Sequence, residues 1–252
     1  MPNNDRIALI TGANQGIGFQ IAKELAAKGI TVLVGSRNSG NGKKAASQIG
    51  AKAHPIQLDV TNKASIAAAA RRIGRKFGHL DILVNNAAIA RLGRAKGPVE
   101  EAAKKGKLSV APLNDIRTVY ETNVFGVIAV TQAMLPLLRK SKAANIVNVS
   151  SGVGSLTRTL GEGGEHLREI FGTYSASKTA LNAVTVGFAL DLKAEGIKVN
   201  AACPGFTRTA LNNFHGTQSV EEGAQEPVRL ALLGPDGPTG TYSNAKTGTL
   251  PW

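Results

Sequence analysis

Two side chains four positions apart have the chemistry to exchange a proton with a carbonyl oxygen. Tyr174 and Lys178 lie in the stretch Tyr-Ser-Ala-Ser-Lys, and this spacing places both on one face of a helix. A phenol with an ordinary pKa of about 10 is a poor acid or base at neutral pH. We expect the ammonium of Lys178 to lower the pKa of Tyr174 and make proton exchange practicable. The alternative is an ordinary amphipathic face, because Tyr-x3-Lys also occurs by chance in helices.

Ser151 is a candidate for the same oxygen. It follows the apolar run at residues 145–150, and the end of a strand there would present its hydroxyl group. The three side chains Ser151, Tyr174 and Lys178 therefore form the predicted proton-transfer set.

A glycine-rich turn near the N-terminus predicts a nucleotide site. Its residues are Thr11-Gly12-Ala13-Asn14-Gln15-Gly16-Ile17-Gly18. The spacing Gly-x3-Gly-x-Gly differs from the G-x-G-x-x-G fingerprint of many dehydrogenases. Glycines let the backbone approach a pyrophosphate, and the first turn of the following helix offers it unpaired N–H groups and a partial positive charge. The motif lies between a predicted strand and a predicted helix, as a dinucleotide site requires.

The end of the second predicted strand indicates which dinucleotide is bound. A carboxylate there usually binds the ribose 2′-hydroxyl of NAD, but this chain has Gly35-Ser36-Arg37-Asn38. Arg37 can form a bidentate, charge-assisted pair with a 2′-phosphate. The sequence therefore favours NADPH over NADH. The alternative is that Arg37 is only a solvated loop residue.

Short apolar runs alternate with stretches of helical period along the chain. Strands are predicted at residues 6–11, 31–36, 53–60, 80–86, 145–150, 198–203 and 241–243. Several are continuously apolar, which is typical of strands buried on both faces of a parallel sheet. The helix that follows Tyr174 has an apolar stripe, Leu181, Val184, Phe188 and Leu192.

The last predicted helix is opened by Ser219 and Glu222, which have the spacing of a capping box, and Pro227 is expected to kink it or stop it early.

The alternation of strands and helices predicts an α/β fold over residues 1–252. We expect a single Rossmann-type domain with a doubly wound, mainly parallel seven-stranded sheet flanked by helices. Ligands of such sheets bind beyond the carboxyl ends of the strands.

With these motifs in this order, the sequence resembles the short-chain dehydrogenase/reductase family, and most closely its carbonyl-reductase-like members. The resemblance covers residues 5–243. It rests on the glycine turn, the proton-transfer set, Leu58-Asp59-Val60, Asn85-Asn86-Ala87-Ala88, Glu121-Thr122-Asn123-Val124 and Pro204-Gly205. The family implies an NADPH-dependent reduction of an aldehyde or ketone to an alcohol by reversible hydride transfer.

The resemblance also implies catalytic roles. Tyr174 would be the general acid, and Ser151 would hydrogen-bond the substrate carbonyl. Lys178 would bind the nicotinamide ribose and lower the pKa of Tyr174. Asn123 would hold the helix and a water that links Lys178 to solvent, although it could be an ordinary polar helix residue.

The implied cofactor contacts follow the carboxyl ends of the strands. They are Gly12, Asn14, Gln15, Gly16, Ile17, Gly18, Arg37, Asn38, Asp59, Val60, Asn86, Ala87, Ala88, Tyr174, Lys178, Pro204, Gly205, Thr207 and Thr209. Asp59 and Val60 would contact the adenine, Asn86 would also brace the sheet, and Thr209 would lie near the pyrophosphate. Asp59 could instead cap the next helix, and Thr209 could be only a polar loop residue.

The sequence departs from the family pattern at two places. Ala88 ends the asparagine motif where the family normally has glycine. The long stretch between Ser151 and Tyr174 predicts a surface insertion at residues 156–171. In carbonyl-reductase-like relatives such insertions can cover the helix face used for dimerisation, so both a monomer and a homo-oligomer are consistent with the sequence.

The net charge of +13 has two interpretations. It could attract a polyanion such as nucleic acid, or it could be a basic surface with a few cations for a phosphate-bearing cofactor. The densest basic group, at residues 91–107, contains Glu100 and Glu101 and no aromatic residue for base stacking. We therefore expect no nucleic-acid partner.

Location and metal binding are predicted from what the composition lacks. Residues 1–10 do not have the pattern of a signal peptide, and no continuous apolar run approaches the ~18 residues of a membrane span. We expect a cytoplasmic protein without a membrane partner. Cys203 is the single cysteine and the four histidines lack metal-ligand spacing, so no metal site is expected.

The predicted partner is a small carbonyl compound whose entrance is formed by residues 90–112, 156–171 and 207–218. A non-catalytic NADPH-binding sensor or scaffold on the same fold is the alternative function. A damaged Tyr/Lys/Ser set would favour the alternative, and here all three residues are present.

Overall fold

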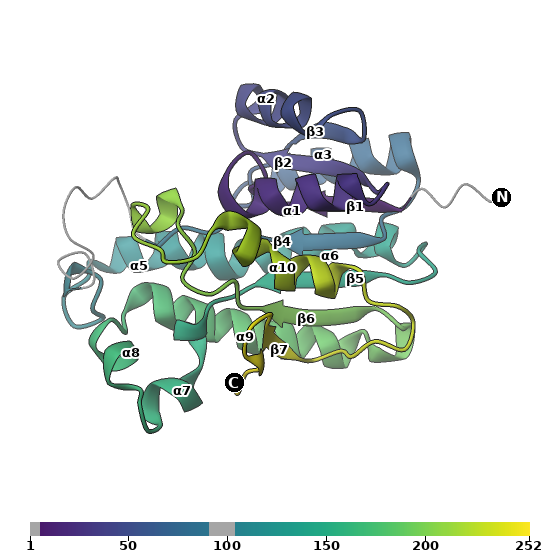
Figure 1. Ribbon diagram of the computed structural model, residues 1–252. Helices are drawn as coiled ribbons and strands as arrows, with labels where there is room; N and C mark the ends of the chain where they lie inside the picture. The colour runs from purple at the N-terminus through teal and green to yellow at the C-terminus, as the bar shows by residue number, and fades with distance from the viewer. Residues whose placement is uncertain (1–5, 91–103) are drawn as a thin grey trace.

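The computed structural model describes residues 6–90 and 104–252, and these form a central sheet of eight strands in the order β3-β2-β1-β4-β5-β6-β7-β8 (Figure 1). The strands are β1 (Ile7–Ile10), β2 (Thr31–Ser36), β3 (Ala53–Gln57), β4 (Ile82–Asn85), β5 (Asn145–Val149), β6 (Lys198–Ala202), β7 (Tyr242–Asn244) and β8 (Gly248–Thr249). All pairs are parallel except β7 with β8. The predicted Rossmann-type α/β fold is confirmed.

The predicted number of seven strands is wrong by one. The eighth strand, β8, is only two residues long and exposed, and it pairs antiparallel with β7. It has no apolar run that periodicity could detect, because its contacts are backbone hydrogen bonds at the edge of the sheet.

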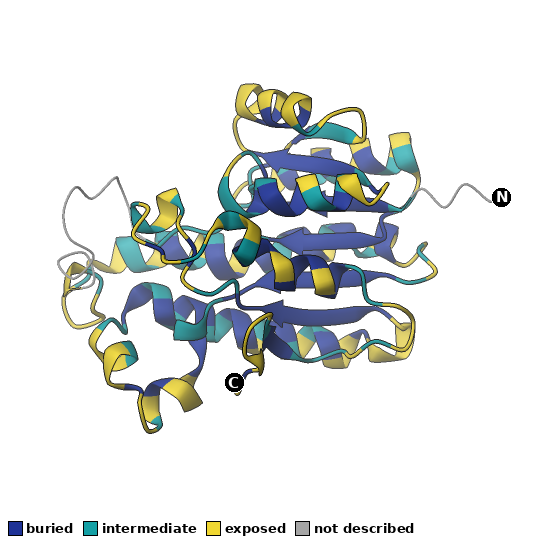
Figure 2. Cartoon of the chain, viewed as in Figure 1, coloured by how far each residue is buried: buried dark blue, intermediate teal, exposed yellow. Residues whose placement is uncertain are grey.

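Helices cover both faces of the sheet, and the strands between them are buried (Figures 1 and 2). The helices are α1 (Gly16–Ala27), α2 (Ser39–Ile49), α3 (Lys63–Phe77), α5 (Leu113–Tyr120), α6 (Gly126–Leu138), α7 (Leu156–Leu160), α8 (Glu165–Glu169), α9 (Thr173–Asp191) and α10 (Val220–Ala231), with a π-helical turn η1 (Glu121–Phe125) between α5 and α6. One apolar cluster joins α1, α2 and α10 to the sheet, and the other joins α3, α6 and α9 to its opposite face. Side chains that alternate along buried strands supply both clusters.

Two predicted boundaries differ from the structure. The strand predicted at residues 53–60 ends at Gln57, because Asp59 turns the chain by accepting hydrogen bonds from the backbone N–H and hydroxyl of Thr61. The capping box of Ser219 and Glu222 is confirmed. Pro227 does not stop α10 early, because the helix continues past it to Ala231.

The predicted insertion forms α7 and α8, which lie at the end of the molecule where α9 begins (Figure 1). Residues of α9 farther along, among them Gly187 and Leu190, are exposed within the described structure. The insertion does not cover this part of the helix, and both a monomer and a homo-oligomer stay consistent with the fold.

One helical run, Leu113–Leu138, is long and apolar enough by length and composition to cross a membrane. The sequence contains no continuous apolar stretch there, because polar residues such as Asn123 interrupt it. Val130 and Met134 of this run are fully buried against the sheet, so core packing accounts for its apolar composition.

A seam of buried hydrogen bonds fixes α9 against the carboxyl end of β5. Nζ of Lys178 donates to the carbonyl oxygen of Val149 at 2.8 Å, and the hydroxyl of Ser150 donates to Oδ1 of Asn182 at 2.5 Å. One turn further along, Nδ2 of Asn148 donates to the hydroxyl of Thr185 at 2.9 Å. These three α9 side chains share one helical face. We call these contacts the α9–β5 seam.

The seam continues across the sheet to the neighbouring elements. Nδ2 of Asn85 on β4 donates to Oδ1 of Asn148 at 2.9 Å and to the hydroxyl of Thr131 on α6 at 3.1 Å. All these groups are buried, so losing one partner would leave another unpaired away from water.

We expect Asn148→Ala to lower the free energy of unfolding by about 2–4 kcal/mol, because it removes a buried side chain and leaves Asn85 and Thr185 without their shared partner. Urea denaturation followed by circular dichroism measures the change. The matched control Asn41→Ala removes an exposed asparagine and should change stability by less than about 0.5 kcal/mol. Equal effects of the two substitutions would contradict a stabilising seam.

Candidate active site

The glycine turn and the start of α1 form a cradle of backbone groups. Gly12 and Gly16 have φ values of 64° and 59°, a region that favours glycine. The α1 N-cap, Gln15, makes no side-chain capping bond, and the first turn contains no acidic residue. Asn14 and Ile17 lie in the same turn and are partly buried. The N–H groups at this helix end are therefore left to a ligand, and a phosphate fits them.

Gly18 is required for a different reason. A Cβ atom at this position would lie 2.3 Å from Nδ2 of Asn86, which itself donates to the carbonyl oxygens of Thr11 and Gly12 at 2.9 and 3.2 Å. The hydroxyl of Thr11 accepts from the backbone N–H groups of Asn86 and Ala87. The predicted bracing by Asn86 is thus present, with Ala88 following in the same loop after β4.

The second and third strands bring the predicted adenine-side residues to the same edge of the sheet. Arg37 is exposed directly after β2, and its guanidinium has no hydrogen bond or ion pair with residues 6–90 or 104–252. Asn38 caps α2 through its side chain, which accepts from the N–H of Asn41. Asp59 follows β3, and Asn62 rather than Asp59 caps α3. Val60 lies beside it, packed on the core.

Ser151, Tyr174 and Lys178 come together at the carboxyl end of β5. Ser151 follows β5, and Tyr174 and Lys178 lie in the first turns of α9. Tyr174 and Ser151 interact through their side chains, and Nζ of Lys178 is 5.7 Å from the centre of the Tyr174 ring. Tyr174 and Lys178 therefore lie on the same face of α9, as predicted, and the α9–β5 seam holds this face against the sheet.

The predicted lowering of the pKa of Tyr174 by Lys178 is wrong for the protein chain considered without a ligand. Burial of the phenol raises its pKa above the ordinary value, and the side-chain hydrogen bond with Ser151 only partly opposes this effect. Burial also lowers the pKa of Lys178 to about 8. Removal from water disfavours both charged forms, so the phenol keeps its proton and the lysine loses one more readily.

Asn123 joins two parts of the site. It is fully buried in η1. Its Oδ1 accepts from the N–H of Ile89 at 2.9 Å, and its Nδ2 donates to the carbonyl oxygen of Ile89 at 2.8 Å and to the hydroxyl of Ser177 at 3.0 Å. It therefore ties the loop after β4 to α9, beside Lys178.

The loop after β6 is held in place by its own side chains. The hydroxyl of Thr207 donates to the carbonyl oxygen of Pro204 at 3.0 Å, and Thr209 caps the short turn Ala210–Asn212 in a capping box. Thr209 also lies against Gly16, since a Cβ atom there would be 3.6 Å from its methyl group. This contact shows that the loop and the glycine turn face each other. Gly205, at the start of the loop, has a φ of 75°.

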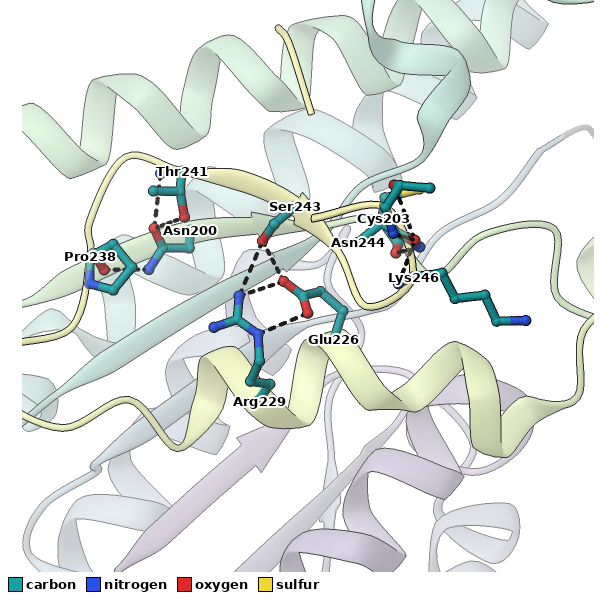
Figure 3. Close-up of polar contacts among 10 residues, drawn as sticks. Asn200, Cys203, Glu226, Arg229, Pro238, Thr241, Ser243, Asn244 and Lys246 are labelled. Atoms are coloured by element: carbon teal, nitrogen blue, oxygen red, sulfur yellow. Dashed lines mark hydrogen bonds and ion pairs between the residues drawn. The ribbon is translucent and has the colours of Figure 1, made fainter. Parts of the chain in front are cut away.

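The strand β7 is clamped to its neighbours near this loop (Figure 3). Nδ2 of Asn244 donates to the carbonyl oxygen of Cys203 at 2.8 Å. The buried carboxylate of Glu226 accepts from Arg229 and from Ser243. The end of β6, which carries Cys203, is therefore fixed from the side of α10 as well.

Sequence reasoning missed the polar residues that position the site. Asn148, Asn182 and Thr185 were not predicted to matter. In the predicted apolar stripe Leu181 and Leu192 are buried and Val184 and Phe188 are partly buried, and polar residues share the buried face of α9 with them. The available signal was the spacing of Lys178, Asn182 and Thr185. Polar residues at helical spacing are usually solvated, so this spacing alone did not indicate a buried polar face.

Part of the predicted substrate entrance lies outside the described residues. The segment 91–103 is not described, nor are the basic residues within it. The other two predicted segments surround the end of the sheet that carries Ser151 and Tyr174 (Figure 1). They expose apolar side chains, including Leu160, Leu211 and Phe214.

The chain was compared with known proteins. It is 38% identical over 237 residues to "Short-chain dehydrogenase anuI" of Penicillium roqueforti, covering 90% of this chain and 89% of the relative. It is 33% identical over 273 residues to (+)-neomenthol dehydrogenase of Arabidopsis thaliana, covering 90% and 92% of the two chains.

Among solved structures, salutaridine reductase from Papaver somniferum has a TM-score of 0.77 at 32% identity and covers 94% of this chain and 99% of its own. NADPH-bound carbonyl reductase from chicken fatty liver has a TM-score of 0.78 at 28% identity and covers 98% and 99%. The sequence profile of the family described as short chain dehydrogenase matches residues 6–219. Together with the fold and the arrangement at the end of β5, these matches show that the chain belongs to the short-chain dehydrogenase family.

Proposed function

We propose that this chain is an NADPH-dependent reductase that converts the carbonyl group of an aldehyde or ketone into an alcohol. The observation that carries the proposal is the meeting of Ser151, Tyr174 and Lys178 beside the glycine turn and the loop after β6. The family contains enzymes named as dehydrogenases and reductases, which supports oxidoreductase chemistry. Within the family, the long insertion at residues 156–171 favours a carbonyl-reductase-like member.

The backbone cradle supports a dinucleotide. Gly12 and Gly16 form the tight turn that places the α1 N-terminus where it would meet a pyrophosphate, and Gly18 leaves room for Asn86 beside it. Asp59 and Val60 would contact the adenine, and Asn86, Ala87 and Ala88 would line the middle of the cofactor. The loop residues Pro204, Gly205 and Thr207 would meet its nicotinamide half, and Thr209 would lie near the pyrophosphate. When bound there, the nicotinamide supplies a hydride.

The side chains of the chain would manage the proton and the charge on oxygen. Tyr174, kept protonated by its raised pKa, donates its proton to the carbonyl oxygen as the hydride arrives. Ser151 donates a hydrogen bond to the same oxygen and stabilises its developing negative charge. Lys178 would bind the ribose hydroxyls, and Asn123 holds α9 and the loop after β4 so that these groups keep their spacing.

Arg37 supports NADPH over NADH. Its exposed guanidinium follows β2 at the edge of the cradle, where a 2′-phosphate would form a charge-assisted pair with it. The first turn of α2 contains no acidic residue that would repel the phosphate. We further propose that the chain acts as one domain, in the cytoplasm, on a small-molecule carbonyl compound.

We expect Tyr174→Phe to lower kcat/KM for carbonyl reduction by about 10²- to 10⁴-fold, because the general acid is lost. NADPH oxidation at 340 nm, with a panel of aldehydes, ketones and quinones, measures the change. Tyr120→Phe is the matched control and should change kcat/KM less than about twofold. Tight NADPH binding without any tyrosine-dependent turnover would favour the sensor or scaffold function instead.

We expect Arg37→Ala to lower kcat/KM for NADPH roughly 10- to 100-fold while leaving that for NADH nearly unchanged, because only NADPH carries the paired phosphate. Steady-state kinetics with each cofactor test this. Arg71→Ala removes an exposed arginine of α3 and controls for the change in net charge. A wild-type protein that uses NADH as well as NADPH would show that Arg37 does not select the cofactor.

We expect kcat/KM for reduction to fall as pH rises through about 8, the lowered pKa of Lys178, because the ammonium form is lost above it while Tyr174 stays protonated. A pH series at saturating NADPH gives the apparent pKa. NMR titration of ¹³C-labelled lysine ε-carbons, with Lys178→Arg to identify the signal, measures it directly. A Lys178 signal that titrates near the ordinary lysine value, about 10.4, would contradict this assignment.

A further inference from the structure

A pocket of about 390 Å³ lies beside the proposed proton-transfer residues. Arg158 of α7 forms one wall, Cys203 at the end of β6 lies within it, and Phe206 and Leu250 add apolar surface. Cys203 is close enough to Tyr174 and Lys178 for a charge on its thiol to change the pKa of both. Sγ of Cys203 would lie 3.7 Å from a Cβ atom at Gly152, the residue after Ser151, so the pocket adjoins the turn that carries Ser151.

The guanidinium of Arg158 is directed at the residue after Ser151. A Cβ atom at Gly152 would lie 2.6 Å from Nη1 of Arg158 and 3.7 Å from Sγ of Cys203. Glycine at this position thus leaves the space that the guanidinium occupies. The positive charge of Arg158 also acts on Cys203 and Tyr242, where it opposes the effect of burial that raises the pKa of each.

This guanidinium lacks a partner within residues 6–90 and 104–252. Arg158 contributes its backbone N–H to the Ser155 cap, and its side chain forms no hydrogen bond or ion pair there. Arg168 in the same insertion differs, since it pairs with Glu165 at 2.6 Å and donates to the carbonyl oxygens of Thr159 and Gly161. The insertion therefore uses one arginine for its own structure and leaves the other facing the pocket.

The second cation of the pocket is already neutralised. Nζ of Lys246, which follows the β7 residue Asn244 (Figure 3), pairs with the carboxylate of Glu222 at 2.7 Å. With the Gln218 amide oriented to satisfy both neighbours, its oxygen accepts from Lys246 and its nitrogen donates to the carbonyl oxygen of Pro204, each at 3.0 Å. Among the described residues that line the pocket, Arg158 is thus a cation without an ion pair.

We propose that Arg158 is a specificity-determining residue that binds a carboxylate of the carbonyl substrate while Ser151 and Tyr174 hold the oxygen to be reduced. The substrate class is an oxo acid, an aldehyde or ketone that also carries a carboxylate. A guanidinium matches a carboxylate with two parallel hydrogen bonds, and Phe206 and Leu250 offer apolar contact to the body of the molecule. The inference rests on the proposed function.

A pair of substrates that differ only in charge tests the proposal. We compare 4-formylbenzoate with its methyl ester, with NADPH, in the wild-type protein, R158M and the charge control R75M, which removes an exposed arginine of α3. The wild-type protein and R75M should prefer the acid. R158M should lose roughly 10- to 100-fold in kcat/KM for the acid and less than about threefold for the ester. Equal losses for both substrates, or no acid preference in the wild-type protein, would overturn the proposal.

If R158M does not fold, the ratio of kcat/KM for the acid to kcat/KM for the ester can be measured in other variants. In G152A the added methyl group would occupy the place of the guanidinium, so this variant should lower the ratio as well. Thermal unfolding and NADPH binding identify the variants that are folded. An unchanged ratio in folded G152A together with an unchanged ratio in folded R158K, whose ammonium cannot form the paired hydrogen bonds, would also overturn the proposal.

A binding measurement separates this inference from the proposed function. Trp252 is the single tryptophan, it stacks on Tyr242 at 5.3 Å, and its carbonyl oxygen accepts from the hydroxyl of Thr157 at 2.8 Å, next to Arg158. Benzoate, but not methyl benzoate, should change its fluorescence, and R158M should abolish the change. Arg158-dependent binding of benzoate without turnover of any carbonyl would refute the reductase function alone. Tyr174-dependent turnover without Arg158-dependent binding would refute this inference alone.

Discussion

The hydrogen bonds between α9 and the end of β5 are the constraint on which the candidate site depends. Tyr174 and Lys178 can act on one oxygen together with Ser151 only if α9 lies against β5 at one rotation and one height. Apolar contacts alone would tolerate small slips of the helix, because they are not directional. Lys178, Asn182 and Thr185 each bond a defined group on or directly after β5, and a slip would leave several of them buried and unpaired.

The same burial that fixes the site also sets its protonation state. Both the phenol of Tyr174 and the ammonium of Lys178 are moved toward their neutral forms by loss of water. A neutral phenol is the form that can give a proton to a carbonyl oxygen. In the chain by itself Tyr174 is therefore in the protonated form, and burial opposes the lowered tyrosine pKa that the Tyr-x3-Lys spacing predicts.

Two walls of the site come from a loop and from an insertion of two short helices, and both depend on the sheet for their position. The loop after β6 lies over the glycine turn, with Thr209 against Gly16, and the clamp at Asn244 and Cys203 fixes where this loop begins. On the other side, the insertion carries Arg158 to the space left by Gly152. The residues at the end of β5 are thus held by buried hydrogen bonds, while the pocket beside them is lined in part by these surface segments.

The sequence by itself determined the fold class, most strand positions and the identity of the residues at the carboxyl ends of the strands, because continuous apolar runs, glycines and motif order are local properties. Only the tertiary structure decided what surrounds each group. The buried side of α9 and the raised pKa of Tyr174 follow from contacts between residues far apart in the chain, such as Asn148 with Thr185. Burial and pairing are set by those distant partners, so the pattern of one segment could not reveal them.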